Sequence, residues 1–233
     1  MDLQFEDVAN LLHISANTLS KWMEKKNIPY YTISGKPRFN RQELEEWLMD
    51  AVANEREYPS FETVDGSSTW NKFCLYRAIH KGCVIKTISK GSKEEIIKTV
   101  MQEAASVLKI NPEIVAEMLI EREHLMSTAL GGGIAVPHTR DFLLHDYTDA
   151  IVTVYLDEPM DWGAIDGTLT DTLIFLFACD DKRHLNLLAK IAHLTMIEET
   201  KNLFGSRPSK ERLLEGILEY EKSLQEGGMV TIS

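Results

Sequence analysis

Gly131-Gly-Gly-Ile-Ala-Val-Pro-His138 is the stretch that decides how this chain folds and what chemistry it carries. Three consecutive glycines allow positive φ angles and let backbone N–H groups approach an anion closely. Pro137 stiffens the backbone beside His138. A histidine that accepts a phosphoryl group needs an outward-facing neutral ring nitrogen and nearby donors for the phosphoryl oxygens. The residues alone leave two readings open, a structural histidine and a phosphoryl acceptor.

A second histidine lies at the start of a helix. Asp181 is expected to cap a helix over residues 182–197, which places His184 in its first turn. Free N–H groups and the partial positive charge of a helix N-terminus favour a bound anion. Leu188 and Ile191 share the face of His184, which therefore points towards the body of the domain, whereas His193 faces the other way. The alternative is a buried or capping histidine.

An α/β unit is expected from about residue 70. Capping signals, proline at a first helical position and β-branched runs mark its elements. They are a strand at 84–88, a helix opened by the capping box Ser92–Glu95, a helix from Pro112 to about Arg122, central strands at 151–156 and 172–178 joined through a turn at Asp166-Gly167, and a last helix capped by Ser209.

Residues 1–50 are typical of a small, mainly helical domain. A first helix covers 5–12, Ser15 caps a second, a hairpin spans 30–39, and a third helix follows Asn40 with a stripe of Leu44, Trp47 and Leu48. Residues 51–69 contain several turn formers and no sustained period, so we expect a linker there. The second domain is expected at 70–226, and residues 227–233 form a tail.

Composition is that of a globular protein, with 44% hydrophobic and 26% charged residues. The net charge of −11 disfavours binding to a polyanion, and residues 1–50 hold six basic and eight acidic residues. The three cysteines form neither a disulfide framework nor a CxxC metal site. Without a signal-like start or an apolar run of membrane-spanning length, we expect a cytoplasmic protein with no membrane insertion.

Four ordered motifs resemble the type 2 enzyme IIA domain of the bacterial phosphotransferase system, the fructose, mannitol and nitrogen-regulatory family. They are Glu121–Thr128, Gly131–His138, Asp166-Gly167 and His184–Ala192. The resemblance covers roughly residues 70–225 and implies an α/β fold, a mixed β-sheet flanked by helices. Ala129 departs from the pattern, since the family usually has glycine there.

The resemblance also implies roles for individual residues. His138 would carry the phosphoryl group, His184 would assist it, and the Arg122 guanidinium would stabilise the transferring charge. The phosphate-binding loop would comprise Ser127, Thr128, Gly131, Gly132 and Gly133. No cofactor is expected beyond the covalent phosphohistidine, so the chain would be a phosphoryl carrier rather than a stand-alone turnover enzyme.

Residues 3–49 resemble the small winged helix-turn-helix of excisionase and MerR-type proteins. By that analogy the helix from Ser15 to Lys26 would enter the major groove of DNA. Its contacts would come from Ser15, Asn17, Thr18 and Lys21. Lys36 and Arg38, on the hairpin that corresponds to the wing, would bind the DNA phosphate backbone. The alternative is a helical face for protein contact. One such module buries little surface, so specific DNA binding would call for a homodimer.

Together these features favour a regulator. His138 would receive phosphate from a phosphocarrier of the HPr or nitrogen-HPr kind, and its phosphorylation state would bias DNA or partner binding. The alternatives are a sugar-specific enzyme IIA that passes phosphate to a IIB transport component, and an interaction scaffold without phosphotransfer. A zinc enzyme ranks last, and no metal is expected, because the sequence shows no further Asp, His or Cys at ligand-like spacing from His138 and His184.

Overall fold

The computed structural model describes residues 2–12, 14–25, 27–53, 73–88, 91–139, 141, 144 and 148–226. The expected tail, and all of the expected linker except residues 51–53, lie outside this range.

The N-terminal unit packs helices against a small three-stranded sheet. Ser15 caps the second helix as expected, since its Oγ accepts the Thr18 N–H at 3.1 Å. The antiparallel sheet has the order β1-β3-β2 and contains the expected hairpin. Its elements are β1 (Leu3–Gln4), α1 (Phe5–Leu12), α2 (Ala16–Glu24), β2 (Tyr31–Ile33), β3 (Lys36–Phe39) and α3 (Arg41–Ala53).

The larger unit is built around a five-stranded mixed sheet of order β4-β7-β8-β6-β5. β4 pairs in parallel with β7 and β6 with β8, whereas β7–β8 and β5–β6 are antiparallel. Its elements are α4 (Cys74–Lys81), β4 (Val84–Ile88), α5 (Lys93–Leu108), α6 (Pro112–Leu125), β5 (Ala129–Gly131), β6 (Ile134–Ala135), β7 (Ala150–Met160), β8 (Thr170–Phe177), α7 (Asp181–Leu194), α8 (Glu198–Gly205) and α9 (Lys210–Glu226).

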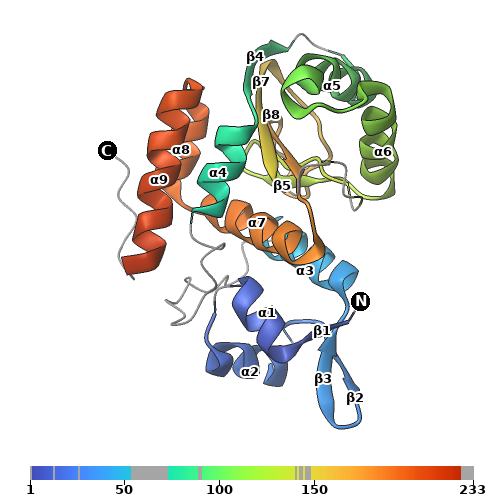
Figure 1. The fold of residues 1–233 in the computed structure, drawn as a ribbon, viewed down its shortest axis with the longest axis vertical. Coiled ribbons are helices and arrows are strands. Elements are labelled where there is room, and N and C mark those ends of the chain that lie inside the picture. Colours follow the sequence, from blue (N-terminus) through green and yellow to red (C-terminus); the bar gives the residue numbers. More distant parts are fainter. Residues whose placement is uncertain are drawn as a thin grey trace.

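Helices cover both faces of this sheet, as the sequence predicts. Figure 1 shows α5 and α6 on one side and α4, α8 and α9 on the other. Each side has its own buried cluster, one including Val100 and Phe175 and the other including Leu188 and Ile217. The central strands are almost wholly buried, which explains why their sequences are continuously apolar rather than alternating.

Every element expected in this unit is present, and several of its boundaries differ from the expected ones. The Ser92–Glu95 capping box is present in full. Asp180, not Asp181, caps α7, because its Oδ1 accepts the Arg183 N–H at 2.9 Å. That helix ends at Leu194, three residues earlier than expected, and α6 continues beyond Arg122 to Leu125. Cap residues one position apart can satisfy the same free N–H groups, so the sequence left this boundary ambiguous.

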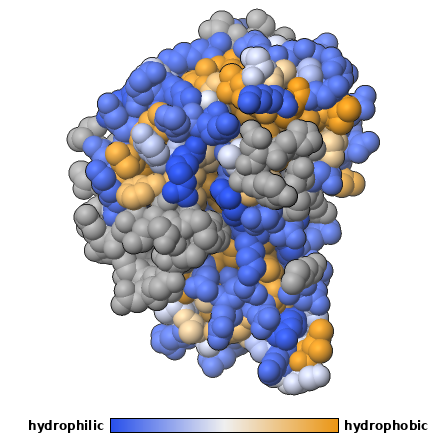
Figure 2. Space-filling view, viewed as in Figure 1, coloured by the Kyte–Doolittle hydropathy of each residue, from blue (hydrophilic) through white to orange (hydrophobic). Residues whose placement is uncertain are grey.

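The surface is mainly hydrophilic on the face drawn in Figure 2, with isolated hydrophobic patches. One patch lies at the end of the β2–β3 hairpin, where Ile33 is 48% exposed. Within the described residues, no helix is both long enough and apolar enough to cross a membrane.

Candidate functional site

His138 follows β6 and is fully buried. The Leu176 N–H donates to the Pro137 carbonyl at 3.0 Å, which holds this segment beside β8. The His138 Nδ1 lies 2.7 Å from the Val136 carbonyl oxygen. Because a carbonyl only accepts hydrogen bonds, Nδ1 carries the proton and Nε2 is the ring nitrogen left for chemistry.

His184 lies next to His138, as expected from the sequence. It belongs to the first turn of α7 and is 1% exposed. The two imidazole centroids are 5.1 Å apart and the rings meet edge to face. Burial, together with the neighbouring His138, holds the pKa of His184 well below its usual value. His184 is therefore a neutral imidazole that can donate or accept a hydrogen bond at the site.

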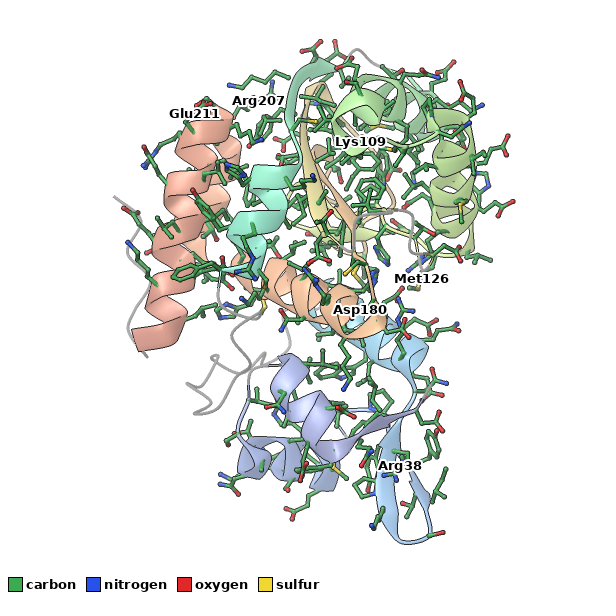
Figure 3. The ribbon with its side chains drawn as sticks, in the orientation of Figure 1. Arg38, Lys109, Met126, Asp180, Arg207 and Glu211 are labelled. Atoms are coloured by element: carbon green, nitrogen blue, oxygen red, sulfur yellow. The ribbon has the colours of Figure 1, made fainter. Side chains whose placement is uncertain are left out.

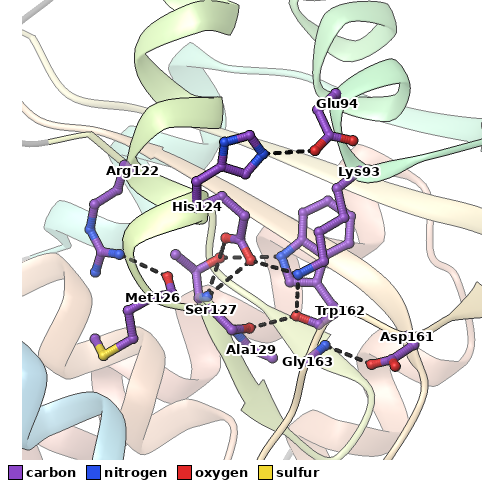
Figure 4. A network of polar contacts seen from close by, with 12 residues as sticks. Lys93, Glu94, Arg122, His124, Met126, Ser127, Ala129, Asp161, Trp162 and Gly163 are labelled. Atoms are coloured by element: carbon purple, nitrogen blue, oxygen red, sulfur yellow. Dashed lines mark hydrogen bonds and ion pairs between the residues drawn. The ribbon is translucent and has the colours of Figure 1, made fainter.

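Arg122 reaches the same place from α6. Its side chain is 6% exposed, and Nη1 donates to the Met126 carbonyl at 3.0 Å, a contact drawn in Figure 4. This bond orients the guanidinium and leaves Nη2 for another acceptor at the site. A fixed guanidinium supplies several donors and a permanent positive charge, which suits an anionic ligand.

Glu45 is the member of the site that the sequence did not indicate. It belongs to α3 of the N-terminal unit and is fully buried. Its Oε1 accepts from His138 Nε2 at 3.0 Å and from Arg122 Nη2 at 3.2 Å, while Oε2 lies 3.7 Å from His184 Nε2. Burial raises the pKa of Glu45, but the hydrogen bond and charge of His138 and the charge of Arg122 outweigh it and lower that pKa overall. Glu45 is therefore a carboxylate.

The group Glu45, His138 and His184 also brings three metal-binding atoms within 4.8 Å of one another. In the part of the chain that the structure describes, this is the group with such a spacing. A cation bound there would lie beside the Arg122 guanidinium, which donates to the same Glu45 oxygen as His138. The positive charge favours an anion at this site over a metal ion.

Ser127 and Thr128 belong to a polar network behind the site, shown in Figure 4. The Thr128 hydroxyl and N–H both donate to the Glu123 carboxylate, the hydroxyl at 2.5 Å. The Ser127 hydroxyl donates to the Trp162 carbonyl at 2.5 Å. Lys93 also bonds Glu123, at 3.1 Å. These contacts fix the segment between Arg122 and β5, so both hydroxyls stabilise the loop in this arrangement.

The three glycines form the turn of the β5–β6 hairpin. Gly131, Gly132 and Gly133 have φ angles of 87°, 59° and 85°, the left-handed region that favours glycine. The Gly132 N–H donates to Asp166 Oδ2 at 2.9 Å, and a Cβ at Gly131 would lie 2.5 Å from the same oxygen. The Asp166 carboxylate thus already accepts a hydrogen bond from one N–H group of the loop. Phosphate binding by this loop stays a prediction.

The residues expected to contact DNA occupy one part of the N-terminal unit. Asn17, Lys21 and Lys36 are exposed, whereas Ser15 and Thr18 are half-buried and bonded to each other at 2.9 Å between their hydroxyls. Arg38 lies on β3, far from the large sheet in Figure 3. None of these residues belongs to the Glu45 site, so the two predicted sites are separate.

Comparisons with known proteins agree with this fold. The nitrogen regulatory protein of Pseudomonas aeruginosa is 28% identical over 150 residues, which cover 63% of this chain and 96% of that protein. The nitrogen regulatory protein of Escherichia coli is 32% identical over 121 residues, 51% of this chain and 73% of that protein. A structure described as a PTS IIA, PtxA, of Streptococcus mutans has the same fold, with a TM-score of 0.51 and 21% identity over 66% of this chain and 97% of that one.

Two family profiles divide the sequence as its motifs do. A profile described as a helix-turn-helix domain matches residues 3–51. A second profile, described as the phosphoenolpyruvate-dependent sugar phosphotransferase system, EIIA 2, matches residues 77–220, which is more than half of the chain. On these matches the chain belongs to the EIIA type 2 family and carries an N-terminal helix-turn-helix domain.

Proposed function

We propose that His138 accepts a phosphoryl group on Nε2 from a phosphohistidine protein of the HPr type, and that this phosphorylation controls DNA or partner binding by the N-terminal module. The observation that carries the proposal is the hydrogen bond from His138 Nδ1 to the Val136 carbonyl at 2.7 Å. It leaves the Nε2 lone pair as the nucleophile once no proton is bound there.

The transfer itself exchanges one P–N bond for another. The Nε2 lone pair of His138 attacks phosphorus, a new P–N bond forms, and the P–N bond to the donor histidine breaks with its electron pair returning to the donor ring. Arg122 supplies positive charge beside the transferring group, and His184 supplies a neutral ring nitrogen for a phosphoryl oxygen. Arg122 Nε and His184 Nε2 are buried without a hydrogen-bond partner among the described residues, which leaves both available to such a ligand.

The regulatory part of the proposal rests on the fusion of the two domains. A phosphoryl group adds about two negative charges at neutral pH, enough to change how nearby surfaces associate. Asn17, Lys21 and Lys36 remain exposed for contact with DNA or a protein. The nitrogen regulatory proteins that match this chain make regulation a closer parallel than sugar transport.

The test is to incubate the full chain with phosphoenolpyruvate, enzyme I and an HPr-type protein, followed by mass spectrometry under non-acidic conditions. The expected product is an acid-labile phosphate on His138 as the Nε2 isomer, absent in His138→Ala and reduced in His184→Ala. Absence of label on the wild-type chain even after prolonged incubation with excess HPr-type donor, long enough for slow labelling to be seen, would refute phosphoryl transfer.

DNA binding by the N-terminal module is tested separately. Gel-shift affinity for genomic fragments is expected to exceed affinity for random duplex, and Lys21→Ala should weaken it. Equal affinity for both kinds of DNA would leave partner binding as the module's role and refute specific DNA recognition.

A further inference from the structure

The N-terminal module docks on the face of the IIA domain that carries His138. Helix α3 lies along α7 and against β5, and α1 also contacts α7 (Figure 1). Leu185 and Ala189 of α7 belong to the buried cluster of the N-terminal unit. Conversely, Met49 of α3 is buried in the cluster of the IIA domain. Each unit therefore buries apolar side chains in the core of the other, so the two units form a packed hydrophobic interface.

Polar contacts flank this shared core. Lys182 Nζ lies 2.6 Å from Asp7 Oδ1, so an ion pair joins α7 to α1. Asn186 Nδ2 donates to the Leu11 carbonyl at 3.3 Å. Arg41, at the start of α3, forms an ion pair with Asp181 in the first turn of α7. These contacts fix the position of α3 over the acceptor histidine.

Glu45 lies where a phosphoryl group on His138 would have to be. Its Oε1 is 3.0 Å from His138 Nε2, and a P–N bond would place phosphorus and its oxygens in that same space. The carboxylate also takes the donors that a phosphoryl group would use, since Arg122 Nη2 bonds it at 3.2 Å. An anion of this chain thus mimics one phosphoryl oxygen in the site.

The Glu45–His138 contact also prevents His138 from acting as a nucleophile, in addition to filling the space that a phosphoryl group needs. Nδ1 donates to the Val136 carbonyl, and Nε2 must donate to Glu45 because that group is a carboxylate. While Nδ1 and Nε2 are both engaged as donors in these hydrogen bonds, neither offers a lone pair for attack on phosphorus. His138 is also fully buried, so a donor protein cannot reach it in this arrangement.

We propose that the helix-turn-helix module is an intramolecular occupant of the phosphoryl-acceptor face, with Glu45 in the place of the phosphoryl group, so that docking of the module and phosphorylation of His138 exclude each other. This inference rests on the proposed function of His138. Because the coupling is reciprocal, a docked module slows phosphorylation and a phosphorylated His138 releases the module. The phosphoryl charge and the Glu45 carboxylate repel each other in a buried space, which supplies the energy for release.

The test compares initial rates of phosphorylation of the full chain by an HPr-type donor. Glu45→Gln removes the charge at nearly constant shape, and Glu43→Gln on the exposed side of the same helix is its matched control. Glu45→Gln is expected to be labelled at least about tenfold faster than wild type, as when a competent state populated below about a tenth becomes dominant. Glu43→Gln should be labelled at the wild-type rate.

The outcomes separate this inference from the proposed function. Equal rates for wild type and Glu45→Gln, both with phosphate on His138, would overturn the mutual exclusion and leave phosphoryl transfer standing. Absence of label on wild type and on Glu45→Gln alike would overturn both. Circular dichroism melting shows whether Glu45→Gln is folded. If it is not, Asp7→Lys, which places a like charge opposite Lys182 and leaves Glu45, His138, His184 and Arg122 unchanged, must show the faster labelling instead.

Discussion

The groups around His138 determine where its ring proton lies and which charges and donors surround it. Val136 fixes the proton on Nδ1, Arg122 supplies the charge for an anion, and the neutral His184 supplies a further ring nitrogen. Glu45 completes the set in the docked arrangement by accepting from Nε2. One anionic position therefore exists at this site, and a carboxylate from the N-terminal module and a phosphoryl group compete for it.

Arg122 gives the residue-scale prediction. Lysine has a single ammonium nitrogen in place of the planar fork, so it cannot serve the two separate positions of Nη1 and Nη2, and Arg122→Lys should lower the labelling rate about 10- to 100-fold. Because Arg122 also holds Glu45, the change belongs in a Glu45→Gln background, measured in single-turnover labelling. Arg212→Lys, half-exposed on α9, is the conservative control and should keep the parent rate. An unchanged rate in Arg122→Lys would show that the guanidinium does not act on the phosphoryl group.

The sequence predicted His138, His184 and Arg122 through ordered motifs, but it did not predict Glu45. In α3 the stripe of Leu44 and Leu48 indicates one buried face, and Glu43, Glu45 and Glu46 all look like solvated acids around it. The available signal was Met49, four residues after Glu45 and on its side of the helix. A second apolar row on a helix of a small domain indicates a second packing partner, but its identity depends on contacts distant in sequence.

Helix α7 is the element that joins the two domains. Most of its residues are buried all round, including Leu185 towards the N-terminal unit and Leu188 towards the IIA core. A helix that is buried on most of its sides is expected between two packed bodies. The run Leu185–Ala192 could have indicated this from sequence, although only one inward face was expected from it.

The Asp7–Lys182 ion pair gives the element-scale prediction. Asp7→Lys places two like charges across the α1–α7 contact, which should weaken docking and raise the labelling rate of His138 about two- to fivefold, the modest effect of a surface pair. Adding Lys182→Glu restores an opposite pair and should return the rate to that of wild type. If the single and double variants were labelled equally fast, the α1–α7 contact would have no part in controlling the acceptor.

At the scale of the whole molecule, docking covers one side of the N-terminal module and leaves another exposed. Helices α1 and α3 face the IIA domain, while α2 and the β2–β3 hairpin extend away from it (Figure 1). Lys21 and Lys36 are exposed in the docked arrangement. Undocking of the module is therefore not needed to expose α2 and the hairpin.

Stability of the folded chain should depend on pH through its buried histidines. Burial lowers the pKa of His193, which lies 2.9 Å from the Tyr220 hydroxyl, from 6.5 to about 4. Between these values the unfolded chain binds a proton that the folded chain does not, so the free energy of unfolding falls as pH drops from about 6.5 to about 4. His184 acts in the same direction, and Glu45 adds a further loss below its ordinary pKa of 4.5.

Urea unfolding at pH 7.0, 5.5 and 4.5 measures this dependence. His193→Asn should lose part of the slope between pH 7.0 and 4.5, whereas His80→Asn, an exposed histidine of α4, should keep the wild-type slope. A His193→Asn slope identical to that of wild type would mean that folding does not lower the pKa of this histidine.

Hydrogen exchange of the wild-type chain before and after phosphorylation tests the central claim most directly. In the unphosphorylated chain, amides of α3 and of the first turns of α7 should be protected by the docked interface. After phosphorylation of His138, the same amides should exchange faster, while those of the central strands β7 and β8 remain unchanged. Equal protection of α3 in the fully phosphorylated and unphosphorylated chains would contradict the competition between Glu45 and the phosphoryl group.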